Sequence, residues 1–144
     1  ITKKKMSYKI IGKYIKDLKF NIPNPKVFFL LSKDISNYKI NIDINSIQVK
    51  QNIIEVLTSL SLTPNNNNFE KIETKIIYST IVEINSEKTL KEEMEKIILI
   101  KVPNEIYSEL RQIFVFLFEN SGFKDVKINE TIDFEKLYKM KKTQ

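Results

Sequence analysis

The stretch YKINIDIN, residues 38–45, alternates apolar and polar side chains at every position. In an extended chain Ile40, Ile42 and Ile44 lie on one side, and the polar residues between them lie on the other. This alternation is typical of a strand that packs one face on a core and exposes the other to water. An alternating isoleucine face is ordinarily part of the core, and the residues alone do not distinguish that role from an open binding surface.

Two further segments continue the period of two. Residues 52–63 repeat it, and residues 69–84 repeat it less regularly, with Ile77 and Ile81 adding apolar surface on the face opposite Ile76 and Val82. PNNNN, residues 64–68, has the composition of a turn. We expect an antiparallel hairpin here, with a second strand that is covered on both sides.

Helical spacing replaces the strand period after residue 88. A short helix capped by Thr89 is expected to reach about Ile98, and Pro103 then opens a long helix that starts near Asn104. Gly122 suits the position just after the end of this long helix. Asp133 suits the cap of a last, short helix with the sequence FEKLYKMKK. Strands first and helices after predict an α+β fold, an antiparallel sheet with helices packed on one side.

The long helix is apolar over most of its circumference near its end. A stripe at helical spacing is formed by Ile106, Leu110, Ile113, Phe114 and Leu117, and Val115, Phe116 and Phe118 extend it almost around the helix. One sheet covers only one side of a helix, so we infer that a second subunit covers the rest. The residues expected at this subunit interface are Leu110, Phe114, Phe116, Leu117 and Phe118.

Composition excludes most enzymatic chemistry. The 144 residues contain no His and no Cys, and glycine occurs only as Gly12 and Gly122. Imidazole and thiolate chemistry, disulfides, the usual zinc sites and glycine-rich phosphate loops are therefore excluded. The sequence predicts a protein that is not an enzyme and uses no cofactor and no metal.

Charge is unevenly distributed along the chain. Residues 1–26 hold eight lysines and a single acid, Asp17, residues 136–144 add four lysines, and the stretch between is net acidic. No apolar run has the length of a membrane span or a signal peptide, so we expect a cytoplasmic protein without direct membrane insertion. The length predicts one domain over residues 1–144. We expect Met6 to be the true start and residues 1–7 to be a disordered or non-native extension.

An apolar run follows a proline turn near the N-terminus. After the strand-like segment that ends at Phe20, Pro23 and Pro25 interrupt the pattern, and Val27, Phe28 and Phe29 follow without a polar break. These residues lie outside any periodic element. They suit either a loop anchored in the core or an exposed apolar surface.

Several motifs, taken in order, resemble the SecB protein-export chaperone family. The likeness covers about residues 8–138 and rests on YIKDLKF (14–20), PNPKVF (23–28), ILIKVPNEIY (98–107), SGF (121–123) and IDFEKLY (132–138). The resemblance implies a four-stranded antiparallel sheet and a homotetramer, a dimer of dimers with the long helices between the dimers. It also implies a chaperone that holds unfolded precursor proteins without ATP and passes them to the SecA motor ATPase.

The resemblance assigns site residues as well. The proline-rich segment would be a crossover loop that helps wall a groove for unfolded chains. The residues expected in this groove are Val27, Phe28, Phe29, Ile40, Ile42, Ile44, Phe134, Leu137 and Tyr138.

SecA docking in that family uses acidic residues on the exposed sheet face. Asp17 matches the first of them, whereas Asn21 and Lys75 stand where further acids are expected, with Glu73 two residues from Lys75 on the same strand face. We expect Asp17 and Glu73 to contact SecA. The departures favour a second interpretation, a SecB-like chaperone that serves a different partner.

A nucleic-acid-binding oligomer is the remaining alternative. Lysines at both ends, with Tyr8, Tyr14 and Phe20 on an early strand, would form a basic aromatic surface. The chain has one arginine, Arg111, and no recognition motif, so we expect no nucleic-acid partner.

Overall fold

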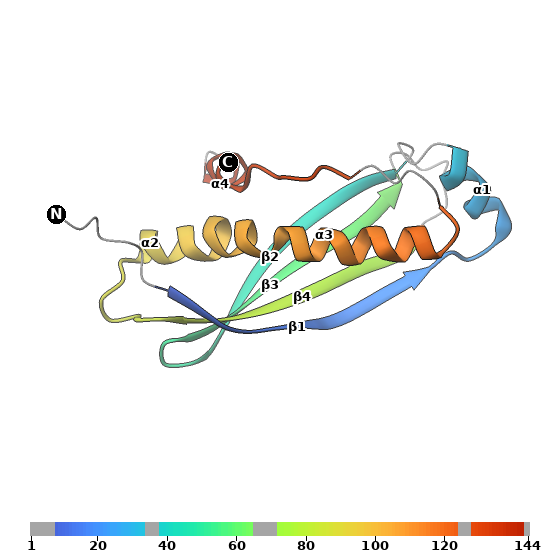
Figure 1. The fold of residues 1–144 in the computed structure, drawn as a ribbon. Coiled ribbons are helices and arrows are strands. Elements are labelled where there is room, and N and C mark those ends of the chain that lie inside the picture. The colour runs from blue at the N-terminus through green and yellow to red at the C-terminus, as the bar shows by residue number, and fades with distance from the viewer. Residues whose placement is uncertain (1–7, 34–37, 65–71, 124–127, 143–144) are drawn as a thin grey trace.

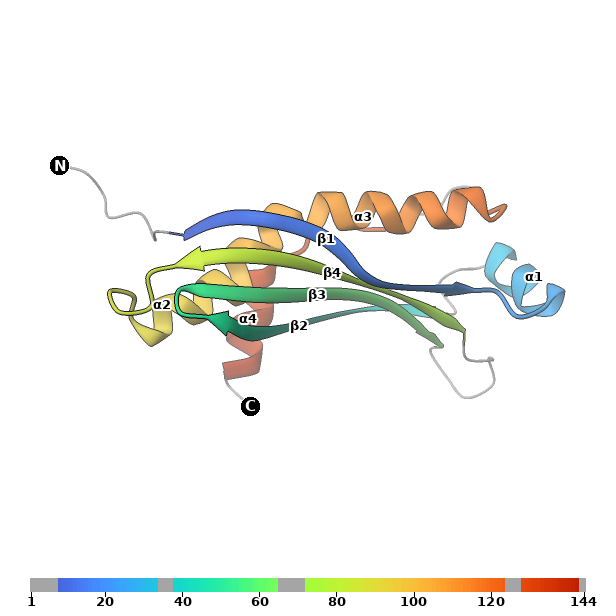
Figure 2. The ribbon, with the colours of Figure 1, turned by 90° about the horizontal axis from the view of Figure 1, so that it is seen from below.

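The computed structural model describes residues 8–33, 38–64, 72–123 and 128–142, so the expected extension at residues 1–7 lies outside the described part. Its centre is one antiparallel sheet in the spatial order β1-β4-β3-β2 (Figures 1 and 2). The strands are β1 (Tyr8–Asn21), β2 (Tyr38–Lys50), β3 (Ile53–Pro64) and β4 (Glu73–Ile84). The predicted α+β class and the four-stranded antiparallel sheet are confirmed.

The strand pairing contains the hairpin expected from the sequence and a second one before it. β2 and β3 join through a tight turn at which Asn52 has a φ of 67°, a conformation that asparagine tolerates better than most residues. The Asn52 side chain also accepts a hydrogen bond of 3.0 Å from the backbone N–H of Ser86, beyond β4. β3 and β4 pair antiparallel, as predicted, and the PNNNN turn lies largely outside the described residues.

The long helix lies over one face of the sheet, which we call the inner face (Figure 1). The helix α3 (Val102–Asn120) crosses this face, and its buried stripe packs on side chains that point inward from β3 and β4. Leu110, Phe114 and Phe118 on the helix are fully buried, as are Leu60 and Ile76 on the strands. No helix in the described part of the chain lies over the opposite, or outer, face of the sheet (Figure 2).

The two helices expected around Pro103 are one continuous helix. α2 (Lys91–Lys96), a π-helical segment η2 (Ile97–Lys101) and α3 follow each other without a break. The backbone N–H of Val102 bonds to the carbonyl of Ile97, five residues back, so the helix widens immediately before Pro103, which has no N–H to donate. The predicted boundary is therefore wrong, and so is the cap at Thr89, because the helix follows Leu90 without a side-chain cap.

The apolar run after the proline turn is a helix and not a loop. α1 (Pro25–Lys33) begins with proline in its first turn, and the Asn24 side chain caps it by accepting a 2.9 Å hydrogen bond from the N–H of Val27. Val27 and Leu31 face inward, one turn apart. A helix of 9 residues shows too few repeats for its period to be recognised in the sequence.

β1 contains two bulges, which reverse its pattern of faces. The register shifts between Ile10 and Gly12 and again between Ile15 and Asp17. Each extra residue moves the following side chains to the other face of the sheet. Tyr14 therefore lies on the outer face, although simple alternation would place it with Phe20 on the inner one.

The last helix, α4 (Phe134–Lys142), lies beside β2 and the π-helical segment (Figure 1). Asp133 caps it, as predicted, by accepting a 2.9 Å hydrogen bond from the N–H of Lys136. Phe134 is buried against Tyr107 of α3, with ring centroids 6.0 Å apart. A long helix and a short last helix on one side of the sheet are thus confirmed.

Candidate functional site

An apolar cleft of about 360 Å³ opens between the edge strand β2 and α4. Its walls come from three elements that are distant in sequence, and hydrophobic side chains dominate them. The lining residues are Ile42, Asp43, Ile44, Leu99, Phe134, Leu137 and Tyr138. Five of the nine residues predicted for the groove are therefore brought together in one place.

Each wall of the cleft has a local cause. Ile42 and Ile44 point inward from β2 because they alternate with polar residues along the strand. Phe134 and Tyr138 lie four residues apart on α4 and form its buried side, whereas Leu137 is 45% exposed at the mouth. The hydroxyl of Tyr138 donates a 3.2 Å hydrogen bond to Glu95 of α2, which ties α4 to the long helix.

The remaining predicted groove residues lie elsewhere. Ile40 is half-buried against the core, next to Ile42 along β2. Val27, Phe28 and Phe29 belong to α1, at the opposite end of the sheet from α4 (Figures 1 and 2). Val27 is fully buried and has no surface for a ligand.

The two phenylalanines of α1 differ in exposure. Phe28 is half-buried against Phe123, with ring centroids 4.9 Å apart, and it also packs on Gly122. Phe29 is 62% exposed. Of the three predicted residues in this segment, Phe29 offers the most apolar surface.

Leu99 was missed by the sequence analysis. It lies in the π-helical segment, whose wider turn changes the angular positions of side chains relative to an ordinary helix. Pro103, four residues later, was the available signal, because proline removes the i to i−4 hydrogen bond to Leu99.

The predicted interface residues divide into buried and open ones. Leu110, Phe114 and Phe118 are covered within the chain by the sheet. Phe116 is 62% exposed, on the side of α3 turned away from the sheet, whereas Leu117 is half-buried and packs against the core. Of the five residues, Phe116 leaves the most surface for contact with another molecule, and Leu117 leaves part of its own.

Both predicted acidic residues lie on the outer face of the sheet. Asp17 is paired with Ile77, and Glu73 is paired with Asn21 near the end of the same two strands. Lys19 and Lys75 face each other directly between these acids. This part of the outer face therefore carries both signs of charge.

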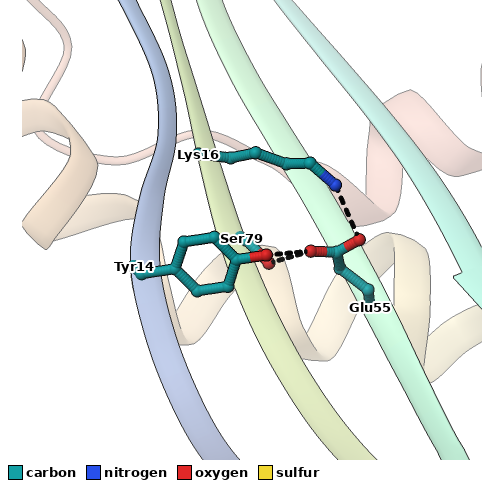
Figure 3. Close-up of polar contacts among 4 residues, drawn as sticks. All are labelled: Tyr14, Lys16, Glu55 and Ser79. Carbon is teal, nitrogen blue, oxygen red and sulfur yellow. Dashed lines mark hydrogen bonds and ion pairs between the residues drawn. The ribbon is translucent and has the colours of Figure 1, made fainter. Parts of the chain in front are cut away.

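On the same outer face, hydrogen bonds to one carboxylate connect three strands (Figure 3). Glu55 of β3 accepts hydrogen bonds from Lys16 (2.9 Å) and Tyr14 (2.5 Å) of β1 and from Ser79 (2.7 Å) of β4. These donors, the Tyr14 hydroxyl foremost, lower the pKa of Glu55 to about 2. The bond to Glu55 in turn raises the pKa of Lys16. Both groups are charged at neutral pH.

The aromatic surface required by the nucleic-acid alternative is not formed within the chain. Tyr8 and Phe20 lie on the inner face, where Phe20 packs edge-on against Phe118 with ring centroids 5.0 Å apart. Tyr14 lies on the outer face. The two bulges of β1 separate them. Stacking on a single platform of these three rings is therefore excluded.

The described residues contain no group of three His, Cys, Asp or Glu side chains arranged to hold a metal ion. No helix among them has the length and apolarity needed to cross a membrane.

Comparisons with known proteins agree with this architecture. The profile of the family described as "Preprotein translocase subunit SecB" matches residues 2–144. The putative protein-export protein SecB of Pelagibacter ubique is 43% identical over 135 residues, covering 94% of this chain and 96% of that protein. The protein-export protein SecB of Anaplasma phagocytophilum is 25% identical, covering 90% of this chain and 89% of its own.

Among solved structures, a SecB-like chaperone of Mycobacterium tuberculosis, in complex with a ChAD peptide from an antitoxin, has the same fold. The TM-score is 0.57 at 10% sequence identity, with coverage of 85% of this chain and 89% of that one. The family profile, the relatives and the shared fold lead to one conclusion. The chain belongs to the SecB family of protein-export chaperones.

Proposed function

We propose that this protein holds non-native precursor proteins in the cytoplasm without ATP and delivers them to the SecA motor of the Sec translocase. The observation that carries this proposal is the apolar cleft between β2 and α4. The family membership supports a chaperone role in export, and the cleft supplies a surface suited to it.

The cleft suits an extended, unfolded chain for two reasons. Its apolar walls reward the burial of any hydrophobic side chain, without a demand for a particular sequence. β2 is also an edge strand, with no strand beyond it in the described part of the chain. An unfolded segment that pairs with this edge would add main-chain hydrogen bonds to the apolar contacts. A folded protein, with its own backbone already paired, offers neither.

The complex of the Mycobacterium tuberculosis chaperone with a peptide supports the same idea by analogy of fold. In our proposal Ile42, Ile44 and Leu99 contact the bound segment from one side, and Leu137 contacts it from the other. Phe134 and Tyr138 are buried and support this wall. Phe29 on α1 would contact a client that extends along the sheet beyond the cleft.

Delivery to SecA would use the outer face. Asp17 and Glu73 lie there, whereas the walls of the cleft come from inner-face side chains and from α4. A partner on the outer face would therefore leave the cleft occupied. This arrangement suits a handover in which the client and the motor are bound together.

The open side of α3 would complete the assembly. Phe116 leaves apolar surface turned away from the sheet, with the half-buried Leu117 on the flank of the helix, and a second copy of the chain would cover this surface. Such packing supports the homotetramer, a dimer of dimers, that the sequence analysis expects.

Titration against one polypeptide in two states tests the chaperone proposal. A chemically unfolded chain should bind, its native form should not, and the binding should survive high salt because it rests on apolar contact. Leu137→Asp should weaken binding of the unfolded chain by about ten-fold, since it places a charge in the mouth of the cleft.

Met140→Asp is the matched control. Met140 is 52% exposed on the same helix and does not line the cleft. Equal losses from both variants would place client binding elsewhere on α4. Binding of native and unfolded chains alike, or its loss at high salt, would contradict the chaperone proposal itself.

A different partner in place of SecA is favoured by one observation. Lys19 and Lys75 oppose each other on the outer face. A surface that binds basic groups of a partner would carry no lysines there, because like charges repel. Client binding of normal strength with no measurable affinity for SecA would support this second candidate.

A further inference from the structure

A β-bulge in β1 places two consecutive side chains on the outer face. The register shifts between Ile15 and Asp17, so Lys16 is an extra residue without a counterpart on β4. Asp17 pairs with Ile77 on the outer face, and Lys16 reaches Glu55 on that same face. The direction of Asp17 therefore depends on how the bulge is held.

The Glu55 carboxylate holds this bulge by accepting hydrogen bonds from the side chains of Tyr14 and Lys16. Glu55 is only 8% exposed, although it lies on the face without helices. β1 and β3 are not neighbours in the sheet, so the bonds from Tyr14 and Lys16 reach across β4, where Ser79 adds a third (Figure 3). A bulge in an edge strand lacks part of the backbone ladder, and such a side-chain anchor restores its order.

We propose that Glu55 is a positioning residue for partner docking: through Lys16 it holds the bulge of β1 and so presents Asp17 to a cationic group of the partner. This inference rests on the proposed docking of SecA at Asp17. It adds a residue that itself need not touch the partner, because its carboxylate is already used by three donors.

Electrostatics and positioning predict opposite effects for one substitution. Lys16→Met removes a positive charge next to Asp17. If the face acted through charge alone, a cationic partner would bind more tightly after this change. If Lys16 acts by holding the bulge, the partner binds less tightly.

Lys19 supplies the matched control. It follows Asp17 by two residues on the same face of β1, opposite Lys75, and takes part in none of the ion pairs between described residues. Lys19→Met therefore removes the same charge from the same neighbourhood without releasing the bulge.

The experiment measures the affinity of purified SecA for the full chain and for three variants by calorimetry. Asp17→Asn should weaken binding about ten-fold and Lys16→Met about three- to ten-fold, whereas Lys19→Met should leave it unchanged or tighten it. The affinity for an unfolded polypeptide should stay the same in all four proteins.

The outcomes separate the two proposals. No effect of Asp17→Asn would overturn docking at Asp17 itself. A loss with Asp17→Asn, together with tighter binding by both lysine variants, would overturn only the positioning role. Loss of client binding in parallel with partner binding in Lys16→Met would also overturn it, by showing a general defect.

A double-mutant cycle provides a second, independent readout. Glu55→Gln should weaken SecA binding in the wild-type background and have no further effect in the Asp17→Asn background, because it acts through Asp17. Effects that simply add would show that Glu55 and Asp17 act separately and would overturn the proposal.

Discussion

The hydroxyl of Tyr78 on β4 donates a 2.8 Å hydrogen bond to the carboxylate of Glu109 on α3. The other oxygen of Glu109 accepts a 2.7 Å bond from the ammonium group of Lys13 on β1. One side chain of the long helix thus binds two neighbouring strands at the border of the apolar core. These bonds fix the helix along the sheet, which apolar packing alone does less specifically.

Removal of the Tyr78 hydroxyl should lower stability mainly below pH 10. Burial, and then the bond to Glu109, raise the pKa of Tyr78 from 10.0 to about 12. The stabilisation is therefore fully present below pH 10 and is lost as the pH rises toward 12. Tyr78→Phe should lower the free energy of unfolding by about 1 kcal/mol at pH 7. Between pH 10 and 12 the stability of this variant should decline less than that of the wild type.

Urea denaturation followed by circular dichroism at pH 7, 10 and 11 checks this. Tyr8, whose pKa is also raised to about 12 by burial and by Glu105, retains part of the alkaline effect in the variant. A variant with the full wild-type decline would show that Tyr78 does not contribute to it.

Glu55 should make the fold sensitive to acid. Its pKa is lowered from 4.5 to about 2, so its contribution is present above pH 4.5 and is lost as the pH falls toward 2. Glu55→Gln should be less stable than the wild type at pH 7, and the difference should shrink as the pH falls from 5 to 3. Chemical denaturation at pH 7, 5, 4 and 3 measures it, and a constant difference would argue against an ionised, bonded Glu55.

The two glycines should respond differently to alanine. Gly122 ends α3 with a φ of +96°, a conformation that alanine adopts at a cost, and a side chain there would also contact Phe28 at 3.4 Å. Gly122→Ala should therefore destabilise the chain by about 1 kcal/mol.

Gly12→Ala is its control. Gly12 has no positive φ, and a new side chain would meet the flexible tip of Ile81 at 3.4 Å. The melting temperature should fall by about 2–4 °C for the Gly122 variant and stay nearly constant for the Gly12 variant. Equal shifts would assign the cost to crowding and not to the backbone conformation.

Phe116→Asp should dissociate the proposed tetramer to dimers without unfolding the subunit. Phe116 is exposed within the chain, so a carboxylate costs nothing there until another subunit covers it. Light scattering gives the mass, and circular dichroism checks the fold. An unchanged tetramer mass would refute the packing of α3 between dimers.

Phe114→Ala contrasts with it. Phe114 is fully buried against the sheet, and its truncation should cost about 3–5 kcal/mol in the stability of the subunit itself. The two residues lie two positions apart on one helix, so any difference reports which side of α3 each one occupies.

Much of the architecture could be predicted from local pattern. The alternation in residues 38–45 and 52–63 marked β2 and β3, because a strand with one buried face leaves a period of two in the sequence. The apolar stripe of the long helix and Gly122 after its end were equally readable. Five groove residues that the family resemblance assigned lie together in the cleft. The spacing placed Ile42 and Ile44 on one side of their strand, whereas the packing of α4 beside β2 brought the two sets together.

Two of the errors, in the long helix and in β1, share one physical cause. A π-helical turn carries the long helix through Pro103, and two bulges exchange the faces of β1, so a regular period misplaces the residues that follow. Neither event changes the composition of the segment. Packing against the rest of the molecule decides between a regular element and an irregular one.

The sequence by itself determined most of the strands and helices, the family and the absence of His and Cys chemistry, because these depend on residue types and on spacing within single segments. Only the tertiary structure decided which faces are covered. It buried Phe114 and left Phe116 open, added Leu99 to the cleft, and enclosed Glu55 with donors from two other strands. Burial and hydrogen bonding of a side chain depend on elements far away in the chain, and local spacing carries no record of them.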